Sequence, residues 1–133
     1  MLRYLLDTNT CIAVIKGRKE TAETFRSKKV DEVAISTVTA FELWTGVQKA
    51  AHAERERVRV DWLLRLISVL DFNHAAAREA ARIRGTLESQ GQKIGPFDNL
   101  IAGHALATNL TLVTNNTREF RRIPQLTIED WMR

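Results

Sequence analysis

The sequence predicts an α/β protein, a three-layer fold in which a central, mostly parallel sheet is flanked by helices. Short apolar runs typical of strands alternate along the chain with helical patterns, so consecutive strands need crossover connections and pair in parallel. The chain has 133 residues and is 44% hydrophobic, which suits one core. We find no internal repeat or linker and therefore expect a single domain over residues 1–133.

The individual elements follow from the pattern of apolar residues and from the residues that begin and end helices. The expected strands cover residues 2–6, 33–36, 68–72 and 110–114, with a final edge strand at 126–128. The expected helices cover 11–15, with Thr8 to Thr10 as its cap, and 21–27, then a helix after Ser36, one that follows the charged segment 52–59, a long Ala/Arg helix over 73–89, and one that begins after Pro96.

The composition favours a nucleic-acid partner over a membrane. The chain has 20 Lys and Arg residues and 16 Asp and Glu residues, which gives a net charge of +4. This excess of positive charge suits an anionic partner. No apolar run is long enough to span a membrane, and the start of the chain looks like a strand rather than a signal peptide. The single cysteine, Cys11, lies in an apolar run, where we expect a buried thiol in a protein of the reducing cytoplasm.

Polar side chains gather where the expected parallel sheet would present its carboxyl edge. Asp7 follows the first strand, and Asn116 and Glu119 follow the fourth. Glu42 lies in the first turns of the helix after the second strand, and Asp98 lies in the first turn of the helix before the fourth. Ligands of open parallel sheets bind outside this edge. Carboxylates brought together there repel one another unless a cation lies among them, and oxygen ligands without a His or Cys cluster favour Mg²⁺ or Mn²⁺.

Each acid also has a structural interpretation. Asp7 and Asp98 both lie where a carboxylate caps a helix. Glu42 lies between Phe41 and Leu43, where a carboxylate with no partner is costly, and this position favours a functional role. His104 is interpreted as a packed or hydrogen-bonded helix residue, and Asp130 as a surface acid.

Four stretches together resemble the signature motifs of PIN-domain proteins, and more narrowly of the VapC toxins of bacterial toxin–antitoxin pairs. The similarity runs from end to end and in order. The stretches are Leu5-Leu6-Asp7-Thr8-Asn9, Ser36-Thr37-Val38-Thr39-Ala40-Phe41-Glu42-Leu43, Ile94-Gly95-Pro96-Phe97-Asp98-Asn99-Leu100-Ile101-Ala102 and Val113-Thr114-Asn115-Asn116-Thr117-Arg118-Glu119-Phe120.

The resemblance implies a PIN-like fold and an endoribonuclease that depends on Mg²⁺, or on Mn²⁺ in its place, and blocks translation by cutting RNA. It implies tRNA as the substrate, with initiator tRNA as the typical target. It further implies a homodimer that is silenced by a cognate VapB-type antitoxin lying across the acidic groove. The resemblance also allows larger toxin–antitoxin assemblies.

Asp7, Glu42 and Asp98 match the family acids directly, and Asp7 and Asp98 are expected to bind the metal. Two residues are candidates for the fourth acidic position of the family. Many relatives carry an aspartate after the last strand, whereas this chain offers Asn116 and, three residues later, Glu119. Either residue suits the role of metal ligand or of positioning the attacking water.

Other functions remain open from the residues alone. A nuclease of the same fold that acts on rRNA, mRNA or DNA has the same acids. A phosphatase with Asp7 as nucleophile normally has a second acid two residues later, where this chain has Asn9. A pocket poor in acids would favour a non-catalytic binding module, but three acids are intact here.

Overall fold

The computed structural model covers residues 1–133 and contains a five-stranded sheet in the order β3-β2-β1-β4-β5, with every pair parallel. The elements in chain order are β1 (Tyr4–Leu6), α1 (Thr8–Ile15), α2 (Lys19–Ser27), the 3₁₀ helix η1 (Val30–Glu32), β2 (Val33–Ser36), α3 (Thr37–Lys49), α4 (Ala53–Leu66), β3 (Ser68–Leu70), α5 (His74–Ser89), α6 (Pro96–Thr108), β4 (Thr111–Val113), α7 (Thr117–Phe120) and β5 (Ile128–Glu129).

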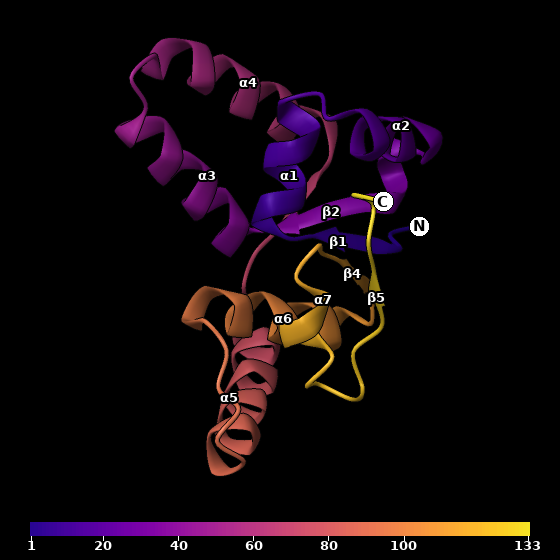
Figure 1. Cartoon of the computed structure of the whole chain (residues 1–133), viewed down its shortest axis with the longest axis vertical. Coiled ribbons are helices and arrows are strands. Elements are labelled where there is room, and N and C mark those ends of the chain that lie inside the picture. The colour runs from indigo at the N-terminus through magenta and orange to yellow at the C-terminus, as the bar shows by residue number, and fades with distance from the viewer.

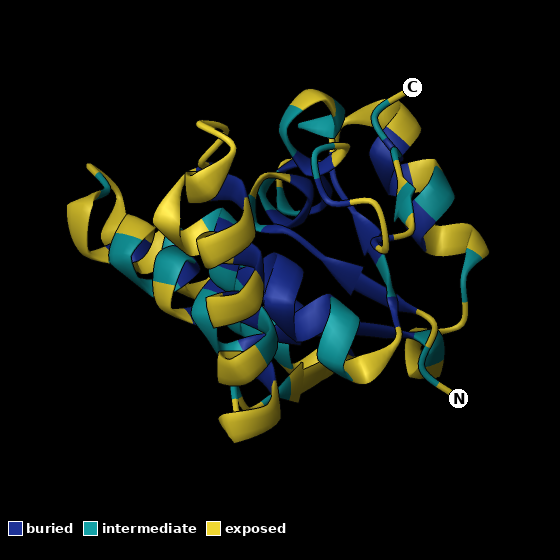
Figure 2. Cartoon of the chain, turned by 90° about the horizontal axis from the view of Figure 1, so that it is seen from below, coloured by how far each residue is buried: buried dark blue, intermediate teal, exposed yellow.

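Helices cover both faces of the sheet, which confirms the predicted three layers. Successive strand residues point to opposite faces. Tyr4 and Leu6 accordingly pack in one apolar cluster with residues of α1 to α4, and Leu5 packs in a second cluster with residues of α5 to α7. Figure 1 shows α1 to α4 on one side of the strands and α5 to α7 on the other. In Figure 2 the buried strands run through the middle of an exposed outer shell.

The strand order places the carboxyl end of β1 at the centre of the molecule. The chain adds β2 and β3 on one side of β1 and then crosses back to add β4 and β5 on the other. β1 and β4 are in register from Tyr4↔Thr111 to Leu6↔Val113, so Asp7 and Thr114 leave the sheet side by side. A reversal of this kind opens a crevice at the carboxyl edge.

Several predicted elements differ in extent from the structure: β1 begins at residue 4 rather than 2, α2 begins at 19 rather than 21, β4 covers 111–113 rather than 110–114, and β5 covers 128–129 rather than 126–128. Two further differences have a clear physical reason. The first helix begins at Thr8, not Cys11, because Asp7 itself is its N-cap and accepts a hydrogen bond from the Thr10 backbone N–H at 2.9 Å. The third strand ends at Leu70, not Phe72. The Phe72 N–H donates instead to Thr37 Oγ1 at 3.0 Å, which takes it out of the strand ladder.

The charged segment 52–59 is also part of a helix rather than a lead-in to one. α4 begins at Ala53, and its first half is held by ion pairs one turn apart, Arg57 with Glu54 and Arg59 with Glu56. Its buried residues, Val60 and Leu63, lie in its second half. None of the helices is both long and apolar enough to cross a lipid bilayer.

α5 and α6 pack against each other at very short range. A Cβ atom built on Gly103 would lie 2.5 Å from the backbone nitrogen of Ala80, so only glycine allows this approach. One turn earlier on α6, the buried Asn99 side chain donates to the carbonyl of Ala80 at 2.8 Å. These two contacts fix the helix that carries Asp98.

Candidate functional site

Asp7 is buried at the carboxyl end of β1, where it has two structural tasks. Its Oδ1 caps α1 through Thr10, as the capping interpretation predicted, and its side chain also accepts a hydrogen bond from Thr114. Burial raises the pKa of this carboxyl above 3.8 despite those hydrogen bonds, which favour the charged form. A carboxylate that is destabilised inside the protein favours a cation as its neighbour.

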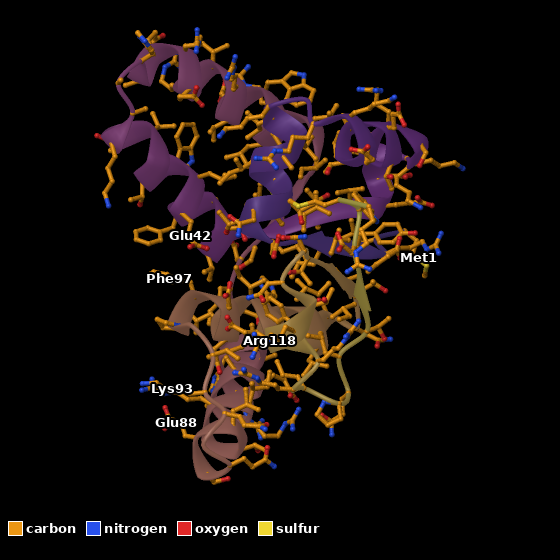
Figure 3. All side chains as sticks on the ribbon, viewed as in Figure 1. Met1, Glu42, Glu88, Lys93, Phe97 and Arg118 are labelled. Atoms are coloured by element: carbon orange, nitrogen blue, oxygen red, sulfur yellow. The ribbon has the colours of Figure 1, made fainter.

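Glu42 lies in the second turn of α3, half-buried, and points toward α1. Its Oε1 accepts a hydrogen bond from Thr8 Oγ1 at 2.6 Å. Residues Phe41 and Phe97 precede Glu42 and Asp98, and their ring centroids lie 5.6 Å apart. Figure 3 shows Glu42 in the N-terminal half of α3, near Phe97 at the start of α6. The two helices therefore bring their acids to the same side of the molecule.

The carboxyl of Asp98 is half-buried and lies among the other acids. The capping interpretation was wrong here, because Gly95 is the N-cap of α6 and the Asp98 side chain forms no hydrogen bond. Burial first, and then the charges of Asp7, Glu119 and Glu42, raise the pKa of Asp98 to about 6. The structure thus brings four acids within electrostatic reach of one another, namely Asp7, Glu42, Asp98 and Glu119. No cationic side chain lowers the pKa of Asp98.

Asn116 and Glu119 both lie after β4, as expected, but they differ in their surroundings. Asn116 is the N-cap residue of α7. Its side chain makes no capping bond, and its backbone N–H donates to Thr114 Oγ1 at 3.0 Å. Glu119 lies in the first turn of α7, and its negative charge helps to raise the pKa of Asp98. Of the two, only Glu119 adds charge to the acid group.

The donor set suits a hard divalent cation with few protein ligands. Every candidate donor is a carboxylate or amide oxygen, as Mg²⁺ and Mn²⁺ prefer. No three His, Cys, Asp or Glu residues lie close enough to form a complete cage. Mg²⁺ commonly binds through only one or two carboxylates and keeps several waters. The raised pKa values of Asp7 and Asp98 therefore suit the binding of such an ion.

Sequence reasoning missed the hydroxyl groups that hold the acids. Thr8 bonds Glu42, Thr114 bonds both Asp7 and the Asn116 backbone, and Thr10 Oγ1 reaches the Val113 carbonyl at 3.2 Å. Each of these residues directly follows a strand or lies in the first turn of a helix, which is the only signal in the sequence. The interpretation of Asp130 as a surface acid was also wrong. Its side chain is only 10% exposed, and its charge adds to the raised pKa of Asp7.

His104 is a packed residue, as predicted, and lies outside this group. Its ring is buried and meets the Phe72 ring edge-on at a centroid distance of 5.6 Å. Burial lowers the pKa of His104, so the ring favours the neutral form. Cys11 is likewise a buried core residue, and burial raises the pKa of its thiol well above its usual value.

Comparisons with known proteins agree with this fold. Residues 4–126 match the PIN domain family. The chain is 42% identical over 131 residues to the tRNA(fMet)-specific endonuclease VapC of Shigella flexneri, covering 98% of this chain and 99% of that protein. It is 38% identical to ribonuclease VapC2 of Rickettsia felis, covering 96% and 97%.

Solved structures give the same result. The chain superposes on one chain of the DNA-bound VapBC complex from Salmonella typhimurium with a TM-score of 0.93 and 42% identity. The match covers 98% of this chain and 99% of the chain in that complex. The TM-score is 0.91 for VapBC2 of Rickettsia felis bound to a promoter DNA fragment, at 36% identity, with 98% and 99% covered. Similarity of this extent and coverage, together with acids gathered at the carboxyl edge, shows that the chain belongs to the PIN-domain family and, within it, to the VapC ribonucleases.

Proposed function

We propose that this protein is the ribonuclease toxin of a toxin–antitoxin pair and that it cleaves tRNA(fMet), the initiator tRNA, so that translation stops. The observation that carries the proposal is the raised pKa of Asp98 among three other carboxylates, with no cationic side chain to offset them. A divalent cation bound among these carboxylates offsets their mutual repulsion and stabilises their charged forms. Two relatives at 42% and 41% identity are named for the same tRNA.

The roles of the acids follow from their surroundings. Asp7 and Asp98 hold Mg²⁺, because Asp7 is buried, Asp98 is half-buried beside it, and a bound cation stabilises the charged forms of both carboxyls. When bound, the metal supplies water activation and stabilises the charge that develops on the phosphate. Glu42, held by Thr8, and Glu119 increase the negative charge that attracts the cation. Asn116 is placed to orient the attacking water at the carboxyl end of β4.

The protein acts in a pair with a VapB-type antitoxin and forms a homodimer. The solved relatives are VapBC complexes. A toxin that cuts initiator tRNA has to be restrained in the cell that makes it. An antitoxin with a basic side chain directed at the acids would neutralise the charge that the metal otherwise neutralises.

Sequencing of RNA 5′ ends tests the substrate. The chain is expressed briefly with and without a cognate VapB-type antitoxin, and new RNA ends are mapped. We expect one dominant cut in tRNA(fMet), which disappears when the antitoxin is co-expressed. Dominant cuts in rRNA or mRNA would instead support a different RNA target. No new ends and unaffected growth, with the protein present in the soluble fraction, would contradict the ribonuclease function itself.

A further inference from the structure

A large cavity lies beside the acids, between α5, the loop before α6, and α7. Its volume is about 780 Å³, within the range of about 300–1,000 Å³ typical of ligand sites. Glu119 is part of its wall, so the cavity opens directly onto the acid group. We call it the α5–α7 cavity. Its other walls come from α5 and from the segment that begins α6.

Cationic side chains in the cavity wall outnumber the anionic ones. Arg84 is neutralised by Glu88, one turn away on α5, at 2.8 Å. Lys93 forms no ion pair, and the Arg122 guanidinium donates only to two backbone carbonyls, those of Gln92 and Lys93, each at 3.3 Å. Two positive charges are therefore without an anionic partner. In Figure 3, Lys93 and Glu88 extend from the same side of the molecule as Glu42 and Phe97.

Part of the cavity wall is apolar. Phe72, Leu87 and Ile94 contribute hydrophobic side chains to its lining. A ligand suited to this cavity carries negative charge at its rim and a flat or apolar group inside. A nucleotide has both parts, since its phosphate carries charge and its base presents an apolar face.

We propose that the α5–α7 cavity binds a nucleotide of the RNA substrate next to the scissile phosphate. Lys93 and Arg122 contact the phosphate, and the base or ribose packs against Phe72, the most exposed of the three apolar side chains. The inference rests on the ribonuclease function proposed above and extends it, because the acids cut one phosphate and the cavity positions its neighbour. The substrate strand therefore crosses the carboxyl edge of the sheet toward α5.

Charge favours RNA over the antitoxin as the occupant. A basic antitoxin segment is attracted by Asp7, Glu42 and Asp98 but repelled by Lys93 and Arg122. A polyanion is attracted by the two cations at the cavity and tolerated at the acids once a divalent cation is bound there. RNA is thus the partner whose charge matches both regions.

A pair of matched variants on α5 tests the proposal. Ala81 is exposed and lines the cavity, whereas Ala75 is exposed on the same helix and lies outside it. Ala81→Glu should raise the KM for a tRNA(fMet) transcript about tenfold or more with kcat near the parent value, because the new carboxylate meets the phosphate. Ala75→Glu carries the same charge change and should leave both constants near the parent values.

A second pair removes a single positive charge. Lys93→Gln should raise KM about fivefold and make the salt dependence of log(kcat/KM) shallower by about 0.7, the expected loss of one phosphate contact with single-stranded RNA. Lys93→Arg should restore both. Lys19→Gln is the control, because Lys19 begins α2 at the far side of the molecule and forms no ion pair. The Mg²⁺ concentration for half-maximal cleavage should not change in Lys93→Gln.

The outcomes separate this inference from the proposed function. If the parent protein does not cleave RNA with Mg²⁺ present, the proposed function fails and the inference fails with it. If the parent cleaves while Ala81→Glu and Lys93→Gln behave like their controls, only the cavity assignment is wrong. Weaker antitoxin binding with unchanged RNA cleavage would also overturn it and assign the cavity to the antitoxin.

Discussion

The carboxyl of Asp98 gives the site a testable pH dependence. With a pKa of about 6, this group is protonated below pH 6 in the metal-free protein, and a proton then competes with the cation. The Mg²⁺ concentration for half-maximal cleavage should be nearly constant from pH 8 to 7 and should rise up to about tenfold per pH unit below 6. The measurement is a metal titration at saturating RNA at each pH.

A variant supplies the control for that titration. Glu119→Gln removes one of the charges that raise the pKa of Asp98, so the pH at which the metal requirement begins to rise should move downward. A requirement that stays flat down to pH 5 in the parent protein would mean that Asp98 does not control metal binding.

The fourth position of the site is a separate prediction. Glu119→Gln should need more Mg²⁺ for half-maximal cleavage at pH 8, because a neutral amide attracts the cation less than a carboxylate does. Asn116→Ala should lower kcat with the metal requirement unchanged, since Asn116 brings no charge and caps α7 without a side-chain bond. Metal titrations of both variants tell these effects apart. A Glu119→Gln protein that matched the parent at every Mg²⁺ concentration would leave Asn116 alone in the fourth place.

At this scale the sequence predicted which acids lie together but not what holds them. Asp7, Glu42, Asp98 and Glu119 are near one another because each follows a strand or lies near the start of a helix at the same sheet edge. Hydrogen bonds such as that from Thr8 to Glu42 join residues 34 positions apart and depend on how α1 meets α3. No local pattern indicates them. Their chemical roles stay predictions.

At the scale of elements, the contact between α5 and α6 controls the position of Asp98. Gly103→Ala should destabilise the protein by about 1–3 kcal/mol, because the new methyl group meets the backbone of Ala80. Gly85→Ala, on α5, is the matched control. Nothing lies within 4 Å of its new methyl group, so it should be neutral or stabilising by up to about 1 kcal/mol. Denaturant unfolding of both variants measures the difference, and equal stabilities would contradict the close packing of the two helices.

Elements with a clear apolar period were predicted well, and those without one were not. The fully buried β2 has the predicted bounds, and α5 begins within one residue of the predicted start. The first half of α4 has no buried residue and is held by ion pairs, so its charged sequence does not indicate a helix. β3 was predicted too long because the hydrogen bond from Phe72 to Thr37 is a tertiary contact.

At the scale of the whole molecule, metal binding and folding stability should be linked. The folded-state pKa of Asp98 is raised from 3.8 to about 6, so its contribution to stability is fully present below pH 3.8 and is lost as the pH rises through 6. In chelator, the Tm of Asp98→Asn should therefore exceed that of the parent by a margin that grows between pH 4 and 7. Mg²⁺ should raise the Tm of the parent and have little effect on that of the variant.

Thermal unfolding at several pH values checks this linkage. A parent protein whose Tm does not respond to Mg²⁺ at any pH would show that the acids do not bind the ion in the folded state.

The fold at this scale, a parallel sheet with helices on both faces, was predictable from the alternation of strands and helices. The strand order was not, because short parallel strands carry no signal for their neighbours.

The central claim is that Asp7 and Asp98 hold the cation with which this protein cuts RNA. The most direct test is cleavage of a tRNA(fMet) transcript by the partner-free protein and by Asp98→Asn, each in Mg²⁺ and in excess chelator. We predict cleavage only by the parent in Mg²⁺, and a loss of at least about 100-fold in Asp98→Asn, with an unchanged circular dichroism spectrum. Full cleavage in excess chelator, or by Asp98→Asn, would contradict the account.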